Sequence, residues 1–173
     1  MEYIFVAGVH GAGKTTLTQK LRAKGLPIIS KSISDLIRQA GKEIEATNKK
    51  TEDIKNNQEL WKKELKKMDV GNKILLLDGH FSLLNEEGNV VPLGAETFEG
   101  THMKKIILVS PPVDTVLSRL ELRDNHTLDK KRMIKFMTIE KELAQKCSLE
   151  KEIPLLIVSN DGMIDNVIDF ILE

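Results

Sequence analysis

A glycine-rich run near the start of the chain constrains the fold more than any other feature. It matches the phosphate-loop pattern G-x-x-x-x-G-K-[ST] in full and reads Gly8-Val9-His10-Gly11-Ala12-Gly13-Lys14-Thr15. A short apolar run over residues 3–7 predicts a buried strand before it, and residues 16–22 predict a helix after it. Because this strand, loop and helix are the context that the pattern requires, a glycine-rich turn that binds nothing is the weaker interpretation.

The spacing of the glycines explains how such a loop binds an anion. Gly8, Gly11 and Gly13 let the backbone turn so that successive N–H groups point inward, at the positive end of the following helix. Lys14 adds a mobile cation for the outer phosphates of a nucleotide, and the hydroxyl of Thr15 is a ligand for Mg²⁺. We therefore expect ATP and Mg²⁺ as cofactors. The residues expected to contact the nucleotide here are Gly8, His10, Gly11, Ala12, Gly13, Lys14, Thr15 and Thr16.

Charge and cysteine content narrow the range of partners. The 173 residues include 26 Lys plus Arg and 26 Asp plus Glu, so no net field favours nucleic acid or an anionic membrane. The single Cys147 excludes an internal disulfide, and no apolar run approaches the roughly 20 residues that a membrane helix needs. We expect no signal peptide at the start of the sequence. We expect one cytoplasmic domain, a monomer or homodimer, that acts on a small molecule.

Predicted strands and helices alternate along the rest of the chain. Apolar runs predict strands at 28–30, 73–78, 105–110 and 153–158, and helical periodicity predicts helices from about Ser34 to Gly41 and over 51–69, 113–124, about 130–150 and 163–172. Residues 85–104 carry four Gly or Pro residues and are predicted to form a loop with room for a short hairpin. This alternation requires a five-stranded parallel sheet with helices on both faces, a three-layer α/β domain.

A carboxylate ends the third predicted strand. The run over 73–78 is typical of a strand buried on both faces of a parallel sheet, and Asp78 is its last residue. Ligands of open α/β sheets bind at the carboxyl ends of the strands. We therefore predict that Asp78 and Thr15 together hold Mg²⁺, with an aspartate that caps a turn as the alternative.

Arginine is rare in this chain, so each one is a candidate for phosphate binding. Only five of the 26 basic residues are arginines, at positions 22, 38, 119, 123 and 132. A guanidinium can bind phosphate through two parallel hydrogen bonds, whereas an ammonium acts as a point charge. Arg119 and Arg123 lie four residues apart and share one helix face. Surface salt bridges for this pair, and plain solvent exposure for Arg38, are the alternatives.

Three stretches beyond the phosphate loop resemble nucleoside monophosphate kinases of the adenylate kinase type, and the downstream part is most similar to the archaeal-type adenylate kinases. Residues 32–38, Ser-Ile-Ser-Asp-Leu-Ile-Arg, resemble the family stretch I-S-T-G-D-M-L-R. Residues 78–80 with Gly88 resemble the segment D-T-H and its following glycine, and residues 119–123 resemble the helix end R-L-x-x-R. The resemblance covers the whole chain. It implies a P-loop NTPase fold in one domain, with an acceptor-binding cover over 31–72 and a short lid over 124–130.

The resemblance also implies roles for individual residues. Arg38 matches the arginine that grips the acceptor phosphate, and Arg119 and Arg123 match arginines that reach the donor phosphates and adenine. Asn160 lies in the loop that holds the adenine through its backbone. With Lys14, the three arginines form the implied catalytic set. The implied activity is Mg²⁺-dependent transfer of the γ-phosphoryl group of ATP to a nucleoside monophosphate.

The chain departs from the family pattern at three places. The family's T-G pair reads Ile33-Ser34, and Gly79 stands where D-T-H has threonine. The lid stretch over 125–129 lacks the family's further arginines, although Arg132 lies one turn beyond it. Two other functions therefore stay open: a kinase of a sugar, an antibiotic or a nucleotide-sugar, and an ATPase or nucleotide switch without an acceptor.

The four histidines differ in their expected roles. His80 follows the predicted metal-binding strand, and we interpret it as a substrate ligand or as a residue that holds Asp78, because phosphoryl transfer depends more on positioning than on a base. His10 occupies a variable loop position and is given no catalytic role. His102 and His126 are expected to be solvated.

Overall fold

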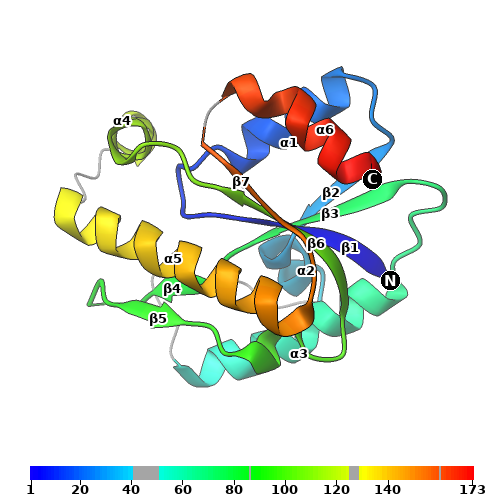
Figure 1. Cartoon of the computed structure of the whole chain (residues 1–173). Coiled ribbons are helices and arrows are strands. Elements are labelled where there is room, and N and C mark those ends of the chain that lie inside the picture. The colour runs from blue at the N-terminus through cyan, green and yellow to red at the C-terminus, as the bar shows by residue number, and fades with distance from the viewer. Residues whose placement is uncertain (41–50, 86, 125–128, 160) are drawn as a thin grey trace.

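A five-stranded parallel sheet lies at the centre of the structure, a computed structural model that describes residues 1–40, 51–85, 87–124, 129–159 and 161–173 (Figure 1). The strand order is β2-β3-β1-β6-β7, and every neighbouring pair is parallel. The strands are β1 (Glu2–Ala7), β2 (Ile28–Ser32), β3 (Ile74–Gly79), β6 (His102–Val109) and β7 (Leu155–Val158). The predicted fold class is confirmed.

Helices cover both faces of this sheet. They are α1 (Lys14–Ala23), α2 (Ile33–Gln39), α3 (Thr51–Lys67), α4 (Val113–Asp124), α5 (Lys130–Lys151) and α6 (Ile164–Leu172). Figure 1 places α1 and α6 on one face of the sheet and α3 and α5 on the other. Within the described ranges, no helix combines the length and the apolar character needed to cross a membrane.

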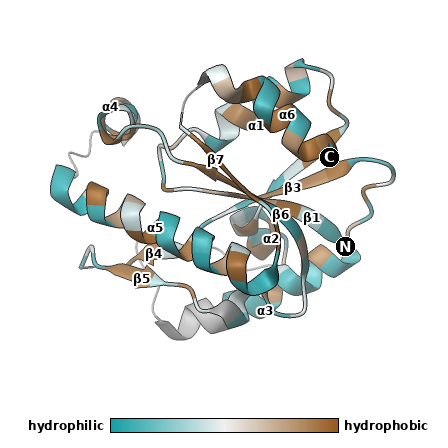
Figure 2. Ribbon diagram, in the orientation of Figure 1, coloured by the Kyte–Doolittle hydropathy of each residue, from teal (hydrophilic) through white to brown (hydrophobic). Residues whose placement is uncertain are grey.

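The alternation of side chains along β1 divides the core into two halves. Ile4 and Val6 pack with apolar residues of α1 and α6, whereas Tyr3, Phe5 and Ala7 pack with those of α2 and α3. Successive side chains of a strand point to opposite faces, so a strand with both sets apolar must be buried on both sides. Figure 2 shows this as hydrophobic colour along the central strands.

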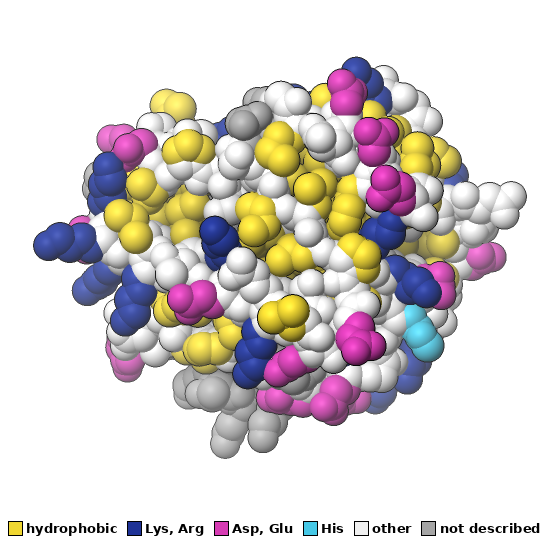
Figure 3. All heavy atoms as spheres, viewed as in Figure 1, with side chains coloured by type: hydrophobic (Ala, Val, Ile, Leu, Met, Phe, Trp, Pro, Cys, Tyr) yellow, Lys and Arg dark blue, Asp and Glu magenta, His cyan; other side chains and the backbone are white. Residues whose placement is uncertain are grey.

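The molecular face around β7, the edge strand, carries charges of both signs. Figure 3 shows hydrophobic side chains gathered in the middle of this face, with basic and acidic side chains interspersed around them. The three half-buried residues at the start of β7, over 155–157, contribute apolar surface here. The mixture of charges agrees with the equal numbers of basic and acidic residues.

The predicted elements are confirmed with shifted ends. The second helix begins at Ile33 because Ser32 caps it, with Ser32 Oγ accepting a hydrogen bond from the Asp35 amide at 3.0 Å. It ends at Gln39, two residues before the expected end at Gly41, which itself lies outside the described residues. The fourth predicted strand begins at His102 rather than at residue 105, and the fifth begins at 155, after Pro154.

The short hairpin for which the predicted loop over 85–104 had room is present, and its first strand begins before residue 85. The strands β4 (Ser82–Leu84) and β5 (Val90–Pro92) form an antiparallel hairpin, and a 3₁₀ helix, η1 (Ala95–Phe98), follows. Leu84 and Val90 pair across the hairpin and pack against the core, which gives these short strands their stability. Asn85 Oδ1 accepts a hydrogen bond from the Asn89 amide at 2.8 Å and closes the turn. The remaining 3₁₀ helix, η2 (Asp161–Met163), leads into α6.

Candidate active site

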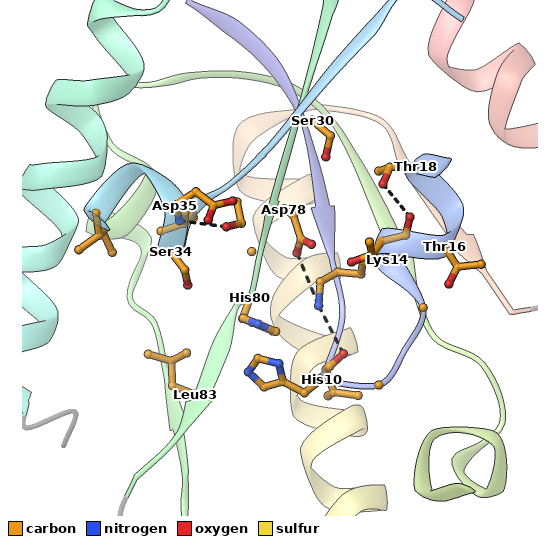
Figure 4. A pocket seen from close by; sticks show the side chains of 18 of the residues that line it. His10, Lys14, Thr16, Thr18, Ser30, Ser34, Asp35, Asp78, His80 and Leu83 are labelled. Carbon is orange, nitrogen blue, oxygen red and sulfur yellow. Dashed lines mark hydrogen bonds and ion pairs between the residues drawn. The ribbon is translucent and has the colours of Figure 1, made fainter. Parts of the chain in front are cut away.

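The register of the sheet brings the phosphate loop, Ser32 and Asp78 to one edge. Asp78 pairs with Val6 of β1 on one side and with Ser32 of β2 on the other. Since β1 runs directly into the phosphate loop, these three strand ends border the same opening. A cleft of about 660 Å³ lies there, lined by residues of the loop, α1, β2, α2, α3, β3 and the hairpin (Figure 4).

The three glycines of the phosphate loop meet both conformational and steric requirements. Gly8, Gly11 and Gly13 have φ angles of 143°, 80° and 103°, which other residues rarely adopt. A Cβ atom at Gly8 would collide with the Val109 carbonyl oxygen, and one at Gly13 would lie 2.8 Å from Nη1 of Arg119. The glycines therefore permit both the left-handed turns of the loop and its close packing against β6 and α4, and such turns direct backbone N–H groups toward an anion.

Lys14 is buried at the first turn of α1 and lies beside Asp78 (Figure 4). Its Nζ donates to the carbonyl oxygens of Gly8 at 2.6 Å and Val9 at 3.4 Å, and lies 3.6 Å from Asp78 Oδ1. Burial raises the pKa of Asp78, and the Lys14 ammonium opposes this shift. The structure thus brings together the predicted phosphate-binding lysine and the predicted metal ligand.

The predicted Mg²⁺ ligands, Thr15 and Asp78, both line the cleft. In the part of the chain that the structure describes, no three or more His, Cys, Asp or Glu residues are grouped as a metal site. Mg²⁺ is commonly bound through one or two carboxylates, with substrate phosphates and water completing its shell. The hydroxyl of Thr15 and the carboxylate of Asp78 fit an ion that is bound jointly with a nucleotide.

Arg119 lies against the phosphate loop. Its Nη1 donates to the carbonyl oxygen of Ala12 at 2.8 Å and to that of Gly11 at 3.4 Å. The side chain lines the cleft and also a second cavity of about 290 Å³ on the other side of the loop. The guanidinium is therefore next to the predicted phosphate site, whereas the side chain of Arg123 lies outside the described part of the structure.

Ser159, the residue before Asn160 in the sequence, lines the second cavity. The lining of this cavity includes Thr16 and Lys20 of α1, Pro112 before α4, and Ser159 after β7. Asn160, which the resemblance assigns to the adenine, lies outside the described residues, directly after Ser159.

Arg38 is placed differently from Arg119. Its Nη1 lies 2.8 Å from Asp35 Oδ1, and its side chain is 65% exposed. Asp35 lines the cleft, but Arg38 is absent from the cleft lining as far as the described residues define it. Arg38 therefore lies at the rim of the cleft, next in sequence to Ile37, which lines it.

The rings of His10 and His80 lie next to each other at the cleft (Figure 4). Their centroids are 4.6 Å apart with an angle of 48° between the ring planes, and both residues line the cleft. His80 therefore faces the phosphate loop across the opening. His102 is exposed at the start of β6, and His126 lies outside the described residues.

Two departures from the adenylate kinase pattern contact each other. A Cβ atom at Gly79 would lie 2.7 Å from Phe5 Cε2 and 2.9 Å from Ile33 Cδ1. Ile33 is the residue that replaces the family's T in T-G, and Gly79 replaces the T in D-T-H. Glycine at 79 is therefore explained by packing, because the isoleucine and the phenylalanine already fill the space of a side chain.

Sequence reasoning missed several residues that surround the site. Arg22, Ser30, Asn57, Leu83 and Leu93 all line the cleft. For Arg22, the rarity of arginine was a usable signal. The other four come from elements far apart in the chain, and no local pattern joins them.

Glu140 of α5 was also missed. It is 1% exposed, and its carboxylate accepts hydrogen bonds from the Phe81 amide at 2.8 Å and from Ser82 Oγ at 2.5 Å. Burial raises the pKa of Glu140, and these hydrogen bonds oppose the shift. A signal existed in the sequence: Glu140 lies four residues from both Phe136 and Ala144, within the apolar stripe of its helix.

Comparisons with known proteins agree with this geometry. Residues 7–136 match the family described as AAA domain. Among solved structures, shikimate kinase from Acinetobacter baumannii in complex with shikimate is 16% identical, with 98% of this chain and 92% of that chain covered and a TM-score of 0.60. Deoxyadenosine kinase from M. mycoides with bound dATP is 13% identical, with both chains fully covered at 100% and a TM-score of 0.56.

A third solved structure, TT1252 from Thermus thermophilus, is 14% identical, with 98% of this chain and 95% of that chain covered and a TM-score of 0.56. No curated protein sequence matches the chain. At these identities the structural likeness establishes the fold, which is that of P-loop kinases. The more specific resemblance to adenylate kinases stays a prediction.

Proposed function

This chain belongs to the AAA domain family, which its residues 7–136 match, and from that premise we propose that it is an ATP- and Mg²⁺-dependent phosphotransferase. It moves the γ-phosphoryl group of ATP to a small-molecule acceptor in the cleft. The observation that carries the proposal is the meeting of Lys14, Thr15, Asp78 and Arg119 around one glycine-rich loop at the edge of the cleft.

The donor is proposed to span the two cavities. Gly13, Thr16 and Arg119 line both of them, so a nucleotide with its phosphates at the loop can extend its base into the second cavity. Lys20 and Ser159 line the second cavity, and Asn160 follows Ser159 in the sequence. Arg119 then lies between base and phosphates, and Arg123, one turn further along α4, is the second proposed arginine on the donor side.

The residues of the cleft provide positioning and positive charge for the transfer. Lys14 exchanges its carbonyl partners for the outer phosphates, and Arg119 adds charge from the opposite side of the loop. When bound, Mg²⁺ neutralises charge on the phosphates. The acceptor oxygen bonds to the γ-phosphorus as the bond to ADP breaks. The proposed cover over 31–72 and the lid over 124–130 exclude water from this step.

A nucleoside monophosphate is the proposed acceptor. Its phosphate would be bound by Arg38, which must turn from Asp35 into the cleft. The rim position of Arg38 and its exposed side chain leave room for that rotation. The cover over 31–72 then holds the base, with Ile33 in place of the family's threonine.

One observation favours a second acceptor class, a neutral alcohol such as a sugar. Asp35 and Asp78 line the same cleft, and the charge of Asp35 acts to raise the pKa of Asp78. The two carboxylates repel an anionic acceptor, whereas an alcohol can donate a hydrogen bond to a carboxylate and accept one from the hydroxyl of Ser30 or Ser32.

An acceptor screen tests the proposal. The protein is incubated with ATP, Mg²⁺ and, separately, the common nucleoside monophosphates, nucleosides and sugars, and both ADP and phosphorylated acceptor are measured. Phosphorylated product with a monophosphate supports the first acceptor class, and product with an alcohol supports the second. Release of ADP without any phosphorylated acceptor favours an ATPase or nucleotide switch and contradicts the transferase.

A further inference from the structure

Glu140 is a buried acid that the proposed chemistry does not use. It lies in the middle of α5, the helix that follows the proposed lid, and only 1% of it is exposed. An ionisable side chain at such a position is costly unless it makes hydrogen bonds or ion pairs. Its contacts therefore indicate why an acid is present there.

Both oxygens of the Glu140 carboxylate bind the chain just beyond β3. Oε1 accepts from the Phe81 amide at 2.8 Å, and Oε2 accepts from Ser82 Oγ at 2.5 Å. These two residues come directly after His80, so the carboxylate holds the segment that carries Asp78 and His80. The link joins two segments 58 and 59 residues apart in sequence.

The side chain of Phe81 is fixed from another direction. Its ring lies edge-on to Phe5 with centroids 5.0 Å apart, and 5.3 Å from the ring of Phe98. The aromatic contacts hold the ring, and Glu140 holds the backbone amide of the same residue. With both attachments in place, the end of β3 has little freedom to tilt away from the phosphate loop.

We propose that Glu140 is a positioning residue for the phosphate site. Its carboxylate fastens the end of β3 to α5, and in this way it keeps Asp78 and His80 directed at the phosphate loop. Glu140 contacts neither nucleotide nor metal in this role. The inference rests on the proposed function, because it acts through Asp78 as a Mg²⁺ ligand.

The electrostatics of the site agree with this placement. Burial raises the pKa of Glu140, whereas the hydrogen bonds from Ser82 and Phe81 and the charge of Lys14 lower it. The acid therefore lies within the field of the phosphate-binding lysine, behind the cleft rather than in it.

The test measures how much Mg²⁺ strengthens ATP binding. The dissociation constant of ATP is determined for the full chain in excess Mg²⁺ and in EDTA, and the ratio of the two isolates the metal contribution. In Glu140→Ala, we expect this ratio to fall about tenfold, because Asp78 loses its alignment, while ATP binding in EDTA is unchanged. Amide hydrogen exchange at Phe81 accelerates in the same variant.

Two further variants separate positioning from general destabilisation. Glu140→Gln can still accept from the Phe81 amide and can donate to Ser82 Oγ, so we expect it to restore both the ratio and the slow exchange. Ala144→Gly lies one turn further along α5, is fully buried, and weakens the helix while keeping both hydrogen bonds of the Glu140 carboxylate. It is expected to lower the melting temperature and to leave the Mg²⁺ ratio at the wild-type value.

The outcomes separate this inference from the proposed function. If Glu140→Ala keeps the wild-type effect of Mg²⁺ on ATP binding, the positioning role alone is overturned. The same conclusion follows if Ala144→Gly reduces that effect as much as Glu140→Ala does. A wild-type protein whose ATP binding does not respond to Mg²⁺ overturns the proposed function, and this inference with it.

Discussion

The ammonium of Lys14 lies 3.6 Å from the carboxylate of Asp78, and both groups line the same cleft. On the proposed function, a phosphate that enters the loop competes with Asp78 for Lys14. Asp78, released from the lysine, would then be available to hold Mg²⁺, so the arrival of the nucleotide would complete the metal site. This relationship connects the first two predictions.

Lys14→Ala is expected to reduce ATP turnover by about 10²- to 10³-fold, because the outer phosphates lose their nearest cation. The fold should persist, since the phosphate loop keeps its glycine turns. ADP release measures the activity, and circular dichroism checks the fold. Lys24→Ala is the control, because Lys24 is exposed and its Nζ lies 3.5 Å from Asp165 Oδ1. Turnover within a few-fold of wild type in Lys14→Ala would contradict the loop assignment.

Asp78→Asn keeps the size of the side chain and removes the charge that holds the metal. We expect the Mg²⁺ concentration for half-maximal activity to rise about tenfold, without recovery at higher ATP concentration. Activity is measured across a Mg²⁺ titration at fixed ATP. Asp114→Asn serves as the control, because Asp114 is exposed and pairs with Lys130 at 2.7 Å. An unchanged titration in Asp78→Asn would assign Asp78 a structural role.

Arg38→Lys tests the monophosphate acceptor. An ammonium keeps the charge of Arg38 but loses the two parallel hydrogen bonds, so the acceptor KM should rise roughly ten- to hundredfold while the KM for ATP hardly changes. Arg119→Lys is the matched substitution and should act on the KM for ATP or on kcat. Equal effects of the two substitutions on both substrates would contradict this division of roles.

Asp35→Asn tests the neutral acceptor in the same assay. It removes one of the two carboxylates, so binding of an alcohol should weaken and binding of an anionic acceptor should improve. The change is read as the acceptor KM for a sugar and for a monophosphate. If Arg38→Lys is silent and Asp35→Asn raises the sugar KM, the acceptor is an alcohol.

Glu140→Gln is expected to change how stability depends on pH. Burial raises the pKa of Glu140 in the folded state above its ordinary 4.5, so the folded protein binds this proton more tightly than the unfolded chain does. The free energy of unfolding that Glu140 contributes therefore falls as the pH rises from about 4.5 through the raised pKa. The glutamine cannot titrate, so the free energy of unfolding of the variant relative to that of the wild type increases across this pH range and is constant above it. Urea unfolding at a series of pH values measures the difference; a difference independent of pH is the contrary result.

The phosphate loop and the five strands could be predicted because their signals are local. The glycine spacing of residues 8–15 and the apolar run of 73–78 each lie within one short window. The same local reading placed Asp78 at a strand end, and the register of the sheet brings it beside Lys14.

The rest of the site depends on contacts between distant segments. Glu140 meets Phe81 across 59 residues, and the apolar stripe of its own helix showed only that position 140 faces inward. A short hairpin was expected, but its two strands could not be placed, because each is three residues long and their apolar pairing is visible only once Leu84 lies beside Val90. Whether such residues belong to the site depends on their position in three dimensions and not on a local sequence pattern.

The packing of Phe5 and Ile33 around Gly79 couples these three positions to one another. A Cβ atom at position 79 would lie 2.7 Å from Phe5 Cε2 and 2.9 Å from Ile33 Cδ1, so a threonine there requires both side chains to shift. A smaller residue at position 5 would also remove the edge-on contacts of Phe5 with Phe81 and Phe98. Glycine at 79 therefore leaves undisturbed the aromatic rings that pack around the end of β3.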